Sequence, residues 1–119
     1  MPRNVIAIVD DLFFASKIRG TAEAVGVSAS FPRHADGVKE LIQRNSPELI
    51  ICDLHSQKFD VLSLAKILKA DAATQTIPLI GFFSHVHVDL KRAAEEAGFD
   101  RVMTRSAFTN DLAAILTGD

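Results

Sequence analysis

The stretch Val5-Ile-Ala-Ile-Val9 followed by Asp10-Asp11 decides the fold class, because five apolar residues end abruptly in two acidic ones. A continuous apolar run of this length is typical of a strand buried on both faces, as in parallel sheets. The run Leu49-Ile-Ile-Cys52 repeats the pattern and is again followed by an acidic residue, Asp53. We therefore predict two central parallel strands with carboxylates immediately beyond their carboxyl ends.

Helix-period segments alternate with short apolar runs along the rest of the chain. Between residues 12 and 25 apolar side chains recur at steps of three and four, and Gly26 stands where helices often end. We predict strands at 5–9, 27–31, 49–52, 77–83 and 99–103, and helices at 12–25, 35–44, 61–70, 88–97 and 107–116. Strands that alternate with helices require right-handed crossovers and helices on both faces of the sheet. The prediction is a three-layer α/β/α fold with a five-stranded, doubly wound parallel sheet in the flavodoxin-like order 2-1-3-4-5.

Length and composition are those of one ordinary globular domain of 119 residues, with 48% hydrophobic and 24% charged residues. A net charge of −2 argues against a nucleic-acid partner, and no apolar run approaches the ~20 residues of a membrane span. The single cysteine, Cys52, lies in an apolar run and is expected to be a buried thiol in a reducing compartment. We expect one cytoplasmic domain over residues 1–119, without nucleic-acid or membrane partners.

Three acidic residues are expected at one edge of this sheet. In the flavodoxin-like order ligands bind between the first and third strands, where the winding reverses, so Asp10, Asp11 and Asp53 would share a cleft. Converging carboxylates take up protons unless a cation neutralises them, and oxygen ligands with water favour Mg²⁺ over a Ca²⁺ cage. A carboxylate is also a possible nucleophile toward phosphorus. The structural alternative is that Asp11 caps the next helix and Asp53 is an ordinary loop residue.

The sequence resembles the receiver domains of bacterial two-component response regulators, the single-domain chemotaxis type included, over essentially the whole chain. The motifs that carry the resemblance are Ile8-Val-Asp10-Asp11, Leu49-Ile-Ile-Cys-Asp53-Leu54, the strand from Pro78, and Gly98-Phe-Asp-Arg-Val-Met-Thr-Arg105. The resemblance implies that Asp53 accepts a phosphoryl group from a histidine kinase or phosphotransfer protein. It also implies that Asp10, Asp11, Asp53 and the backbone carbonyl of His55 hold Mg²⁺, and that Asp60 opens the third helix.

In this sequence, the loop after Asp53 and the end of the fourth strand differ from the pattern that is usual in the family. After Asp53 the loop has Gln57 where a Pro is usual and Val61 where a Gly is usual. The fourth strand of the family ends in a Ser or Thr whose hydroxyl bonds the phosphoryl group. An ungapped count puts Phe83 there, and Ser84 follows one residue later. The sequence leaves both residues as candidates for the switch position.

The end of the fifth strand also differs, because the Lys-Pro pair of the family is replaced by Arg105-Ser106. Arginine keeps the positive charge and grips phosphate oxygens in a fork, but its planar guanidinium is no isostere of an ammonium. The acidic half of the site is thus intact, whereas the switching half is altered.

Four histidines, His34, His55, His85 and His87, are scattered over the chain. Zinc needs three or four converging ligands, so we do not expect these residues to bind zinc. They are expected to be solvated loop residues, with His85 as a candidate contact at the cleft.

Two functional hypotheses follow from the residues and the resemblance. The first is a stand-alone receiver without an output domain, which is phosphorylated on Asp53 and signals through contacts with a downstream protein target. The second is a pseudo-receiver, a constitutive protein-interaction or dimerisation module, motivated by Phe83, Arg105 and Ser106. A homodimer is consistent with either hypothesis. We do not expect an enzyme, because the sequence has neither phosphate-binding glycine loops nor a cofactor motif.

Overall fold

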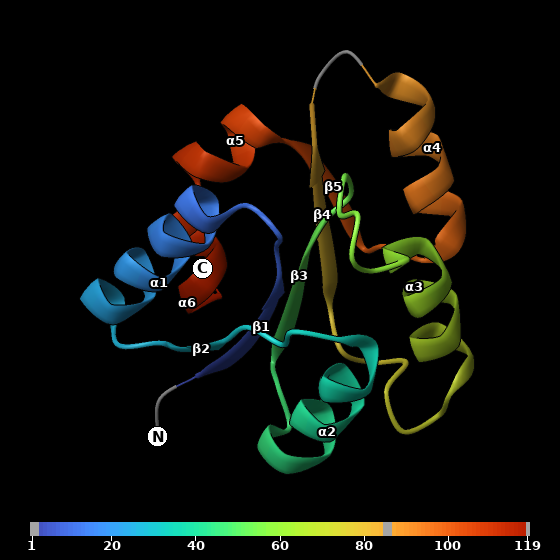
Figure 1. Cartoon of the computed structure of the whole chain (residues 1–119), viewed down its shortest axis with the longest axis horizontal. Coiled ribbons are helices and arrows are strands. Elements are labelled where there is room, and N and C mark those ends of the chain that lie inside the picture. Colours follow the sequence, from blue (N-terminus) through green and yellow to red (C-terminus); the bar gives the residue numbers. More distant parts are fainter. Residues whose placement is uncertain (1–2, 85–86, 119) are drawn as a thin grey trace.

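A computed structural model describes residues 3–84 and 87–118, whose parallel strands form one sheet in the order β2-β1-β3-β4-β5. Helices α1, α5 and α6 cover one face of this sheet, and α2, α3 and α4 cover the other (Figure 1). The strands are β1 (Asn4–Ile8), β2 (Ser28–Ser30), β3 (Leu49–Asp53), β4 (Leu79–Phe83) and β5 (Arg101–Thr104). The helices are α1 (Leu12–Val25), α2 (Ala35–Asn45), α3 (Val61–Ala70), α4 (Val88–Ala97), α5 (Arg105–Asn110) and α6 (Leu112–Thr117). The predicted three-layer fold and strand order are confirmed.

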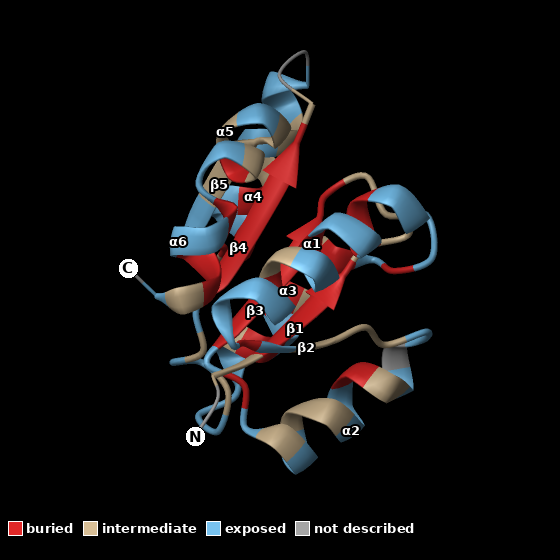
Figure 2. Cartoon of the chain, turned by 90° about the vertical axis from the view of Figure 1, so that its left-hand side faces the viewer, coloured by how far each residue is buried: buried red, intermediate tan, exposed pale blue. Residues whose placement is uncertain are grey.

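Two hydrophobic cores lie on opposite faces of the sheet, because successive side chains of a strand point to opposite sides. In β1, Val5 and Ala7 pack under α1 and α6, whereas Ile6 and Ile8 pack under α2 and α3. Every residue of β3 and β4 is buried, so these central strands belong to the buried layer of Figure 2. Cys52 is buried as predicted, and this burial raises the pKa of its thiol.

Helix ends follow the predicted signals, with one correction at the C-terminal end of the fold. Gly26 and Gly98 adopt left-handed φ values of 76° and 111° and end α1 and α4. The helix predicted at 107–116 is instead two helices separated at Asp111, and the first begins two residues earlier. The earlier start arises because the Thr104 hydroxyl caps α5 by accepting a hydrogen bond from the Ala107 N–H at 3.2 Å.

The strand edges also differ slightly from the prediction. The second strand spans only three residues of the predicted 27–31, and β4 begins two residues after the predicted position 77. No helix in the described part of the chain is long and apolar enough to cross a membrane.

Candidate functional site

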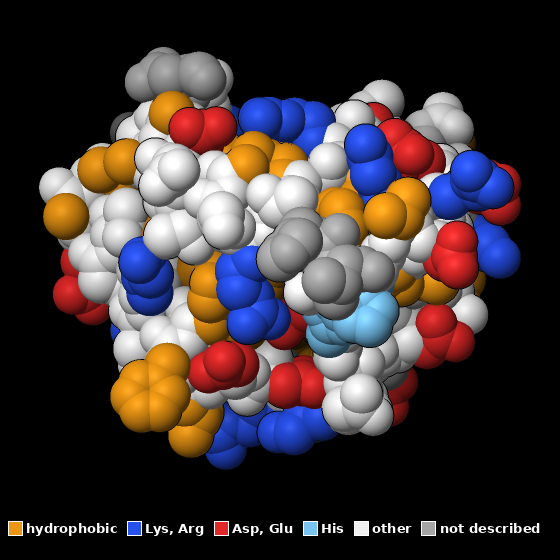
Figure 3. Space-filling model, turned by 90° about the horizontal axis from the view of Figure 1, so that it is seen from above, with side chains coloured by type: hydrophobic (Ala, Val, Ile, Leu, Met, Phe, Trp, Pro, Cys, Tyr) orange, Lys and Arg blue, Asp and Glu red, His pale blue; other side chains and the backbone are white. Residues whose placement is uncertain are grey.

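The carboxyl ends of β1, β3, β4 and β5 lie at the same edge of the sheet. The strand register pairs Ile8 with Cys52, Asp53 with Phe82, and Phe83 with Thr104. The residues that follow these positions therefore lie side by side. Figure 3 looks down on this edge, where acidic, basic and histidine side chains gather near its centre.

Asp53 is a buried carboxylate at this edge, with only 4% of its surface exposed. Its Oδ1 accepts a hydrogen bond from the His55 N–H at 2.9 Å, and its Oδ2 lies 3.8 Å from Nη2 of Arg105. Burial raises the pKa of Asp53, and the negative charge of Asp10 adds to the rise. The His55 N–H and the Arg105 charge offset part of this effect. The negative charge of the carboxylate is thus only partly neutralised in the folded protein.

The raised pKa of Asp53 predicts how stability depends on pH. The folded state holds a proton on this carboxyl more readily than the unfolded chain, so its contribution to stability is present at low pH. That contribution is lost as pH rises from the ordinary pKa of 3.8 through the raised pKa. Denaturant unfolding from acidic to neutral pH should show this loss, and Asp53→Asn should remove it. Identical pH profiles for the two proteins would contradict the assignment.

Asp10 anchors the loop between β3 and α3. Its Oδ1 accepts a hydrogen bond from the Ser56 hydroxyl at 2.9 Å, and its Oδ2 accepts from the N–H groups of Gln57 at 2.7 Å and Lys58 at 3.2 Å. Partial burial acts to raise the pKa of Asp10, but these hydrogen bonds outweigh it and lower that pKa. Both oxygens of this carboxylate are therefore engaged by the protein.

Ser56 joins this anchor from both sides, because its hydroxyl donates to Asp10 and accepts from the Phe59 N–H at 3.1 Å. A hydrogen bond to a charged group contributes about 1.5–3 kcal/mol. Ser56→Ala is expected to lower the free energy of unfolding by about 1–2 kcal/mol, since the site is only partly buried. The matched control is Ser106→Ala, at an exposed hydroxyl, which should change it by less than about 0.5 kcal/mol. Equal losses in denaturant unfolding would contradict the anchoring role.

Asp11 is the N-cap of α1, which is the structural role that the sequence offered as the alternative to metal binding. Its Oδ1 accepts hydrogen bonds from the N–H groups of Phe13 at 2.9 Å and Phe14 at 3.2 Å. Among residues 3–84 and 87–118, no group of three or more His, Cys, Asp or Glu side chains is placed to hold a metal ion. Carboxylate oxygens are the donors that Mg²⁺ prefers, so the residue types fit this ion. Their present arrangement does not form a complete metal site.

Arg105 supplies the positive charge beside Asp53. It begins α5, and its Cζ lies 5.3 Å from the ring centre of Phe14 and 5.7 Å from that of Phe82. Within the described residues, its buried Nε has no hydrogen-bond partner. The aromatic rings thus orient the guanidinium, and it keeps donors that are not used by the protein.

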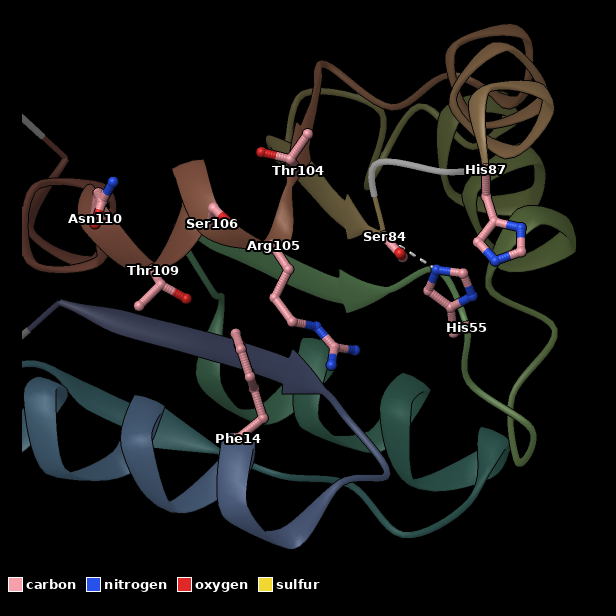
Figure 4. A pocket seen from close by; sticks show the side chains of 9 residues that line it. All are labelled: Phe14, His55, Ser84, His87, Thr104, Arg105, Ser106, Thr109 and Asn110. Carbon is pink, nitrogen blue, oxygen red and sulfur yellow. Dashed lines mark hydrogen bonds between the residues drawn. The ribbon is translucent and has the colours of Figure 1, made fainter.

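The structure separates the two candidates for the switch position. Phe83 is 4% exposed and packs in the core beneath α3 and α4, away from Arg105. Ser84 instead lines a cavity of about 660 Å³, and its N–H donates to Nε2 of His55 at 3.0 Å. Ser84 and Arg105 therefore line the same cavity (Figure 4). The ungapped count along the fourth strand ended at Phe83, one residue before Ser84, whose side chain lines the cavity.

Several side-chain contacts at this edge had no signal in the sequence. The His55 side chain bridges to Ser84, and its ring centre lies 5.0 Å from that of His87. Thr104 lines the same cavity in addition to capping α5. Histidine, serine and threonine are common in loops and at strand ends, so the sequence offered no signal for these contacts. The candidate contact His85 lies outside the described residues.

A flavodoxin-like sheet with a buried carboxylate at the end of β3 and a cation at the end of β5 has the architecture of receiver domains. The chain has the fold of response regulator receivers, as its similarity to known proteins also shows. No protein-family model matches the chain. It is 30% identical over 101 residues to a gliding motility regulatory protein of Myxococcus xanthus. The match covers 84% of this chain but only 13% of that relative.

Solved structures of response regulators share the fold at low sequence identity, and three of them illustrate this. The chemotaxis response regulator CheY4 of Vibrio cholerae has a TM-score of 0.82 and 13% identity, covering 99% of this chain and 98% of its own. The phosphorylated cyanobacterial phytochrome response regulator RcpA has a TM-score of 0.79 and 18% identity, covering 99% and 91%. The Mn²⁺-bound response regulator Rcp1 has a TM-score of 0.75 and 17% identity, covering 98% and 91%. At these identities the shared property is the fold.

Proposed function

We propose that this chain is a receiver that takes a phosphoryl group on Asp53 and signals through protein–protein contacts. The observation that carries the proposal is the buried carboxylate of Asp53, with the guanidinium of Arg105 3.8 Å away at the end of β5. The donor would be a histidine kinase or phosphotransfer protein, and the recipient of the signal a downstream protein target. In this proposal the chain is a phosphoryl acceptor in the cytoplasm and not itself an enzyme.

The acceptor chemistry needs an ionised carboxylate and a way to neutralise phosphoryl oxygens. An oxygen of Asp53 would attack the phosphorus atom, while the bond from phosphorus to the donor nitrogen breaks and the imidazole leaves with the electron pair. Arg105 would bind the phosphoryl oxygens with its unused donors, and the hydroxyl of Ser84, which lines the same cavity, would donate a hydrogen bond to them.

A divalent cation is part of the proposal because the residue types at this edge suit it. Asp10, Asp11, Asp53 and the backbone carbonyl of His55 would hold Mg²⁺, which when bound neutralises carboxylate and phosphoryl charge. The Mn²⁺-bound state of Rcp1, which has the same fold, supports divalent metal binding in general. Asp10 would have to give up hydrogen bonds from the loop to serve as a ligand.

A second candidate is a constitutive protein-interaction or dimerisation module that is not switched by phosphorylation. It is favoured by the engagement of Asp10 and Asp11, whose carboxylates already serve a loop and a helix cap. The experiment that separates the candidates is incubation with acetyl phosphate, with and without Mg²⁺, followed by intact mass measurement. A Mg²⁺-dependent gain of one phosphoryl group supports the receiver. No gain under either condition favours the constitutive module.

A further inference from the structure

A second hollow lies beside the acceptor site, between the start of α1, the segment after β2 and the loop before α3. It has a volume of about 670 Å³, and we call it the basic groove. The lining residues that matter for its chemistry are Leu12, Arg19, Phe31, Arg33, Lys58 and Phe59. Neither the proposed phosphorylation nor the family resemblance uses these side chains.

Positive charge is concentrated in the basic groove. Arg19, Arg33 and Lys58 line it, and the one acidic lining residue, Asp10, already accepts three hydrogen bonds from the loop. None of the three cations forms an ion pair with the described part of the chain. The whole chain has a net charge of −2, so this excess of positive charge is local.

Apolar surface adjoins these charges. Leu12 is 81% exposed, and its neighbour Phe13 is 90% exposed. Inside the groove, the guanidinium of Arg19 lies 4.6 Å from the ring centre of Phe31. Stacking on an aromatic ring holds a guanidinium in place while leaving its edge free to donate hydrogen bonds. Figure 3 shows exposed hydrophobic side chains next to basic ones at the lower edge of this face.

We propose that the basic groove binds an acidic segment of a partner protein that carries a large apolar side chain between its carboxylates. A guanidinium fork can pair bidentately with a carboxylate, so Arg19 and Arg33 would hold the carboxylates of this segment. The apolar side chain would cover Leu12, whose exposure a purely charged ligand would not relieve, and would contact the partly buried ring of Phe31. Nucleic acid is disfavoured because the chain as a whole carries a net charge of −2.

The groove reaches the acceptor site through shared residues. Lys58, in the loop that follows Asp53, lines the groove. Its N–H donates a hydrogen bond to Asp10 at 3.2 Å. A segment bound in the groove would therefore lie next to the acceptor carboxylate. Binding at this surface is nevertheless independent of the proposed phosphorylation, because it needs neither Asp53 nor a metal ion.

The test uses a fluorescein-labelled synthetic peptide of Asp and Glu residues around one Phe, added to the unphosphorylated full chain. Fluorescence anisotropy gives its Kd, and chemical-shift changes of backbone amides map where it binds. We expect shifts at Ser16, Arg19 and Arg33, with Kd at least about tenfold weaker in the double variant Arg19→Glu, Arg33→Glu. The charge-matched control is Lys66→Glu, Lys91→Glu, at exposed positions on α3 and α4, which should bind nearly as the unmodified chain does.

Three results would overturn the proposal. These are absence of peptide binding, equal weakening in the control variant, and shifts that map outside the groove. Tighter binding of a single-stranded RNA to the same residues would also overturn it in favour of nucleic acid. Labelling by acetyl phosphate in the double variant separates the two proposals, since Arg19 and Arg33 are not part of the acceptor chemistry. If the unmodified chain is labelled but does not bind the peptide, the proposed function stands and the peptide-binding proposal is wrong.

Discussion

Replacing Asp53 with Asn is expected to abolish phosphoryl incorporation from acetyl phosphate. An amide oxygen is a much weaker nucleophile than a carboxylate, and no other carboxylate pairs with Arg105 in the described residues. Intact mass measurement should show labelling of the unmodified chain and only background for Asp53→Asn. The matched control is Asp60→Asn, because Asn keeps the capping bond that Asp60 makes to the Ser63 N–H. The control should be labelled normally.

Folding must be verified in the same experiment. Asp53→Asn removes an incompletely neutralised buried charge, so its free energy of unfolding at neutral pH should not fall. Labelling of Asp53→Asn at the rate of the unmodified chain would place the acceptor on another residue. Loss of labelling in the Asp60→Asn control as well would show that the assay reports loop integrity and not the acceptor.

Phe82→Ala is expected to cause the largest loss of stability, about 3–5 kcal/mol. Phe82 is fully buried and stacks between two other rings, with centroid distances of 4.7 Å to both Phe14 and Phe108. Its removal leaves a cavity in the core under α1 and α5 and takes away one of the two rings beside Arg105. Urea unfolding monitored by circular dichroism gives the free energy of unfolding.

The chain provides a matched control for this substitution at Phe13. That ring is 90% exposed, so Phe13→Ala should change the free energy of unfolding by no more than about 0.5 kcal/mol. Similar losses for the two variants would mean that the stacked rings do not form the core described here. If Phe82→Ala unfolds completely, Phe82→Leu keeps most of the buried volume and should show a smaller loss of the same sign.

The fold was predictable because its signals are local and repeat along the chain. Apolar runs such as residues 5–9 and 49–52 predict buried parallel strands from local sequence alone. The crossover rule then limits how these strands can be ordered, and β2-β1-β3-β4-β5 is the order in the structure. Helix ends at Gly26 and Gly98 were equally visible, since a left-handed C-cap favours glycine.

The candidate site was predictable only as a location. The placement of Asp10 and Asp53 at one sheet edge follows from strand order, and the negative charge of Asp10 does raise the pKa of Asp53. The hydrogen bonds of Asp10 could not be predicted, because Ser56 is 46 residues away and loop residues have many conformations. The same holds for His55, whose partner Ser84 lies 29 residues further along the chain.

The sequence by itself determined the doubly wound sheet, the edge where the acidic residues gather and the departures at Arg105 and Ser106. Only the tertiary structure decided that Ser84 and not Phe83 reaches the cavity, and that Asp11 caps a helix. The reason is that strand and helix patterns depend on residues close together in sequence. Side-chain direction and polar pairing depend instead on how distant elements pack against each other.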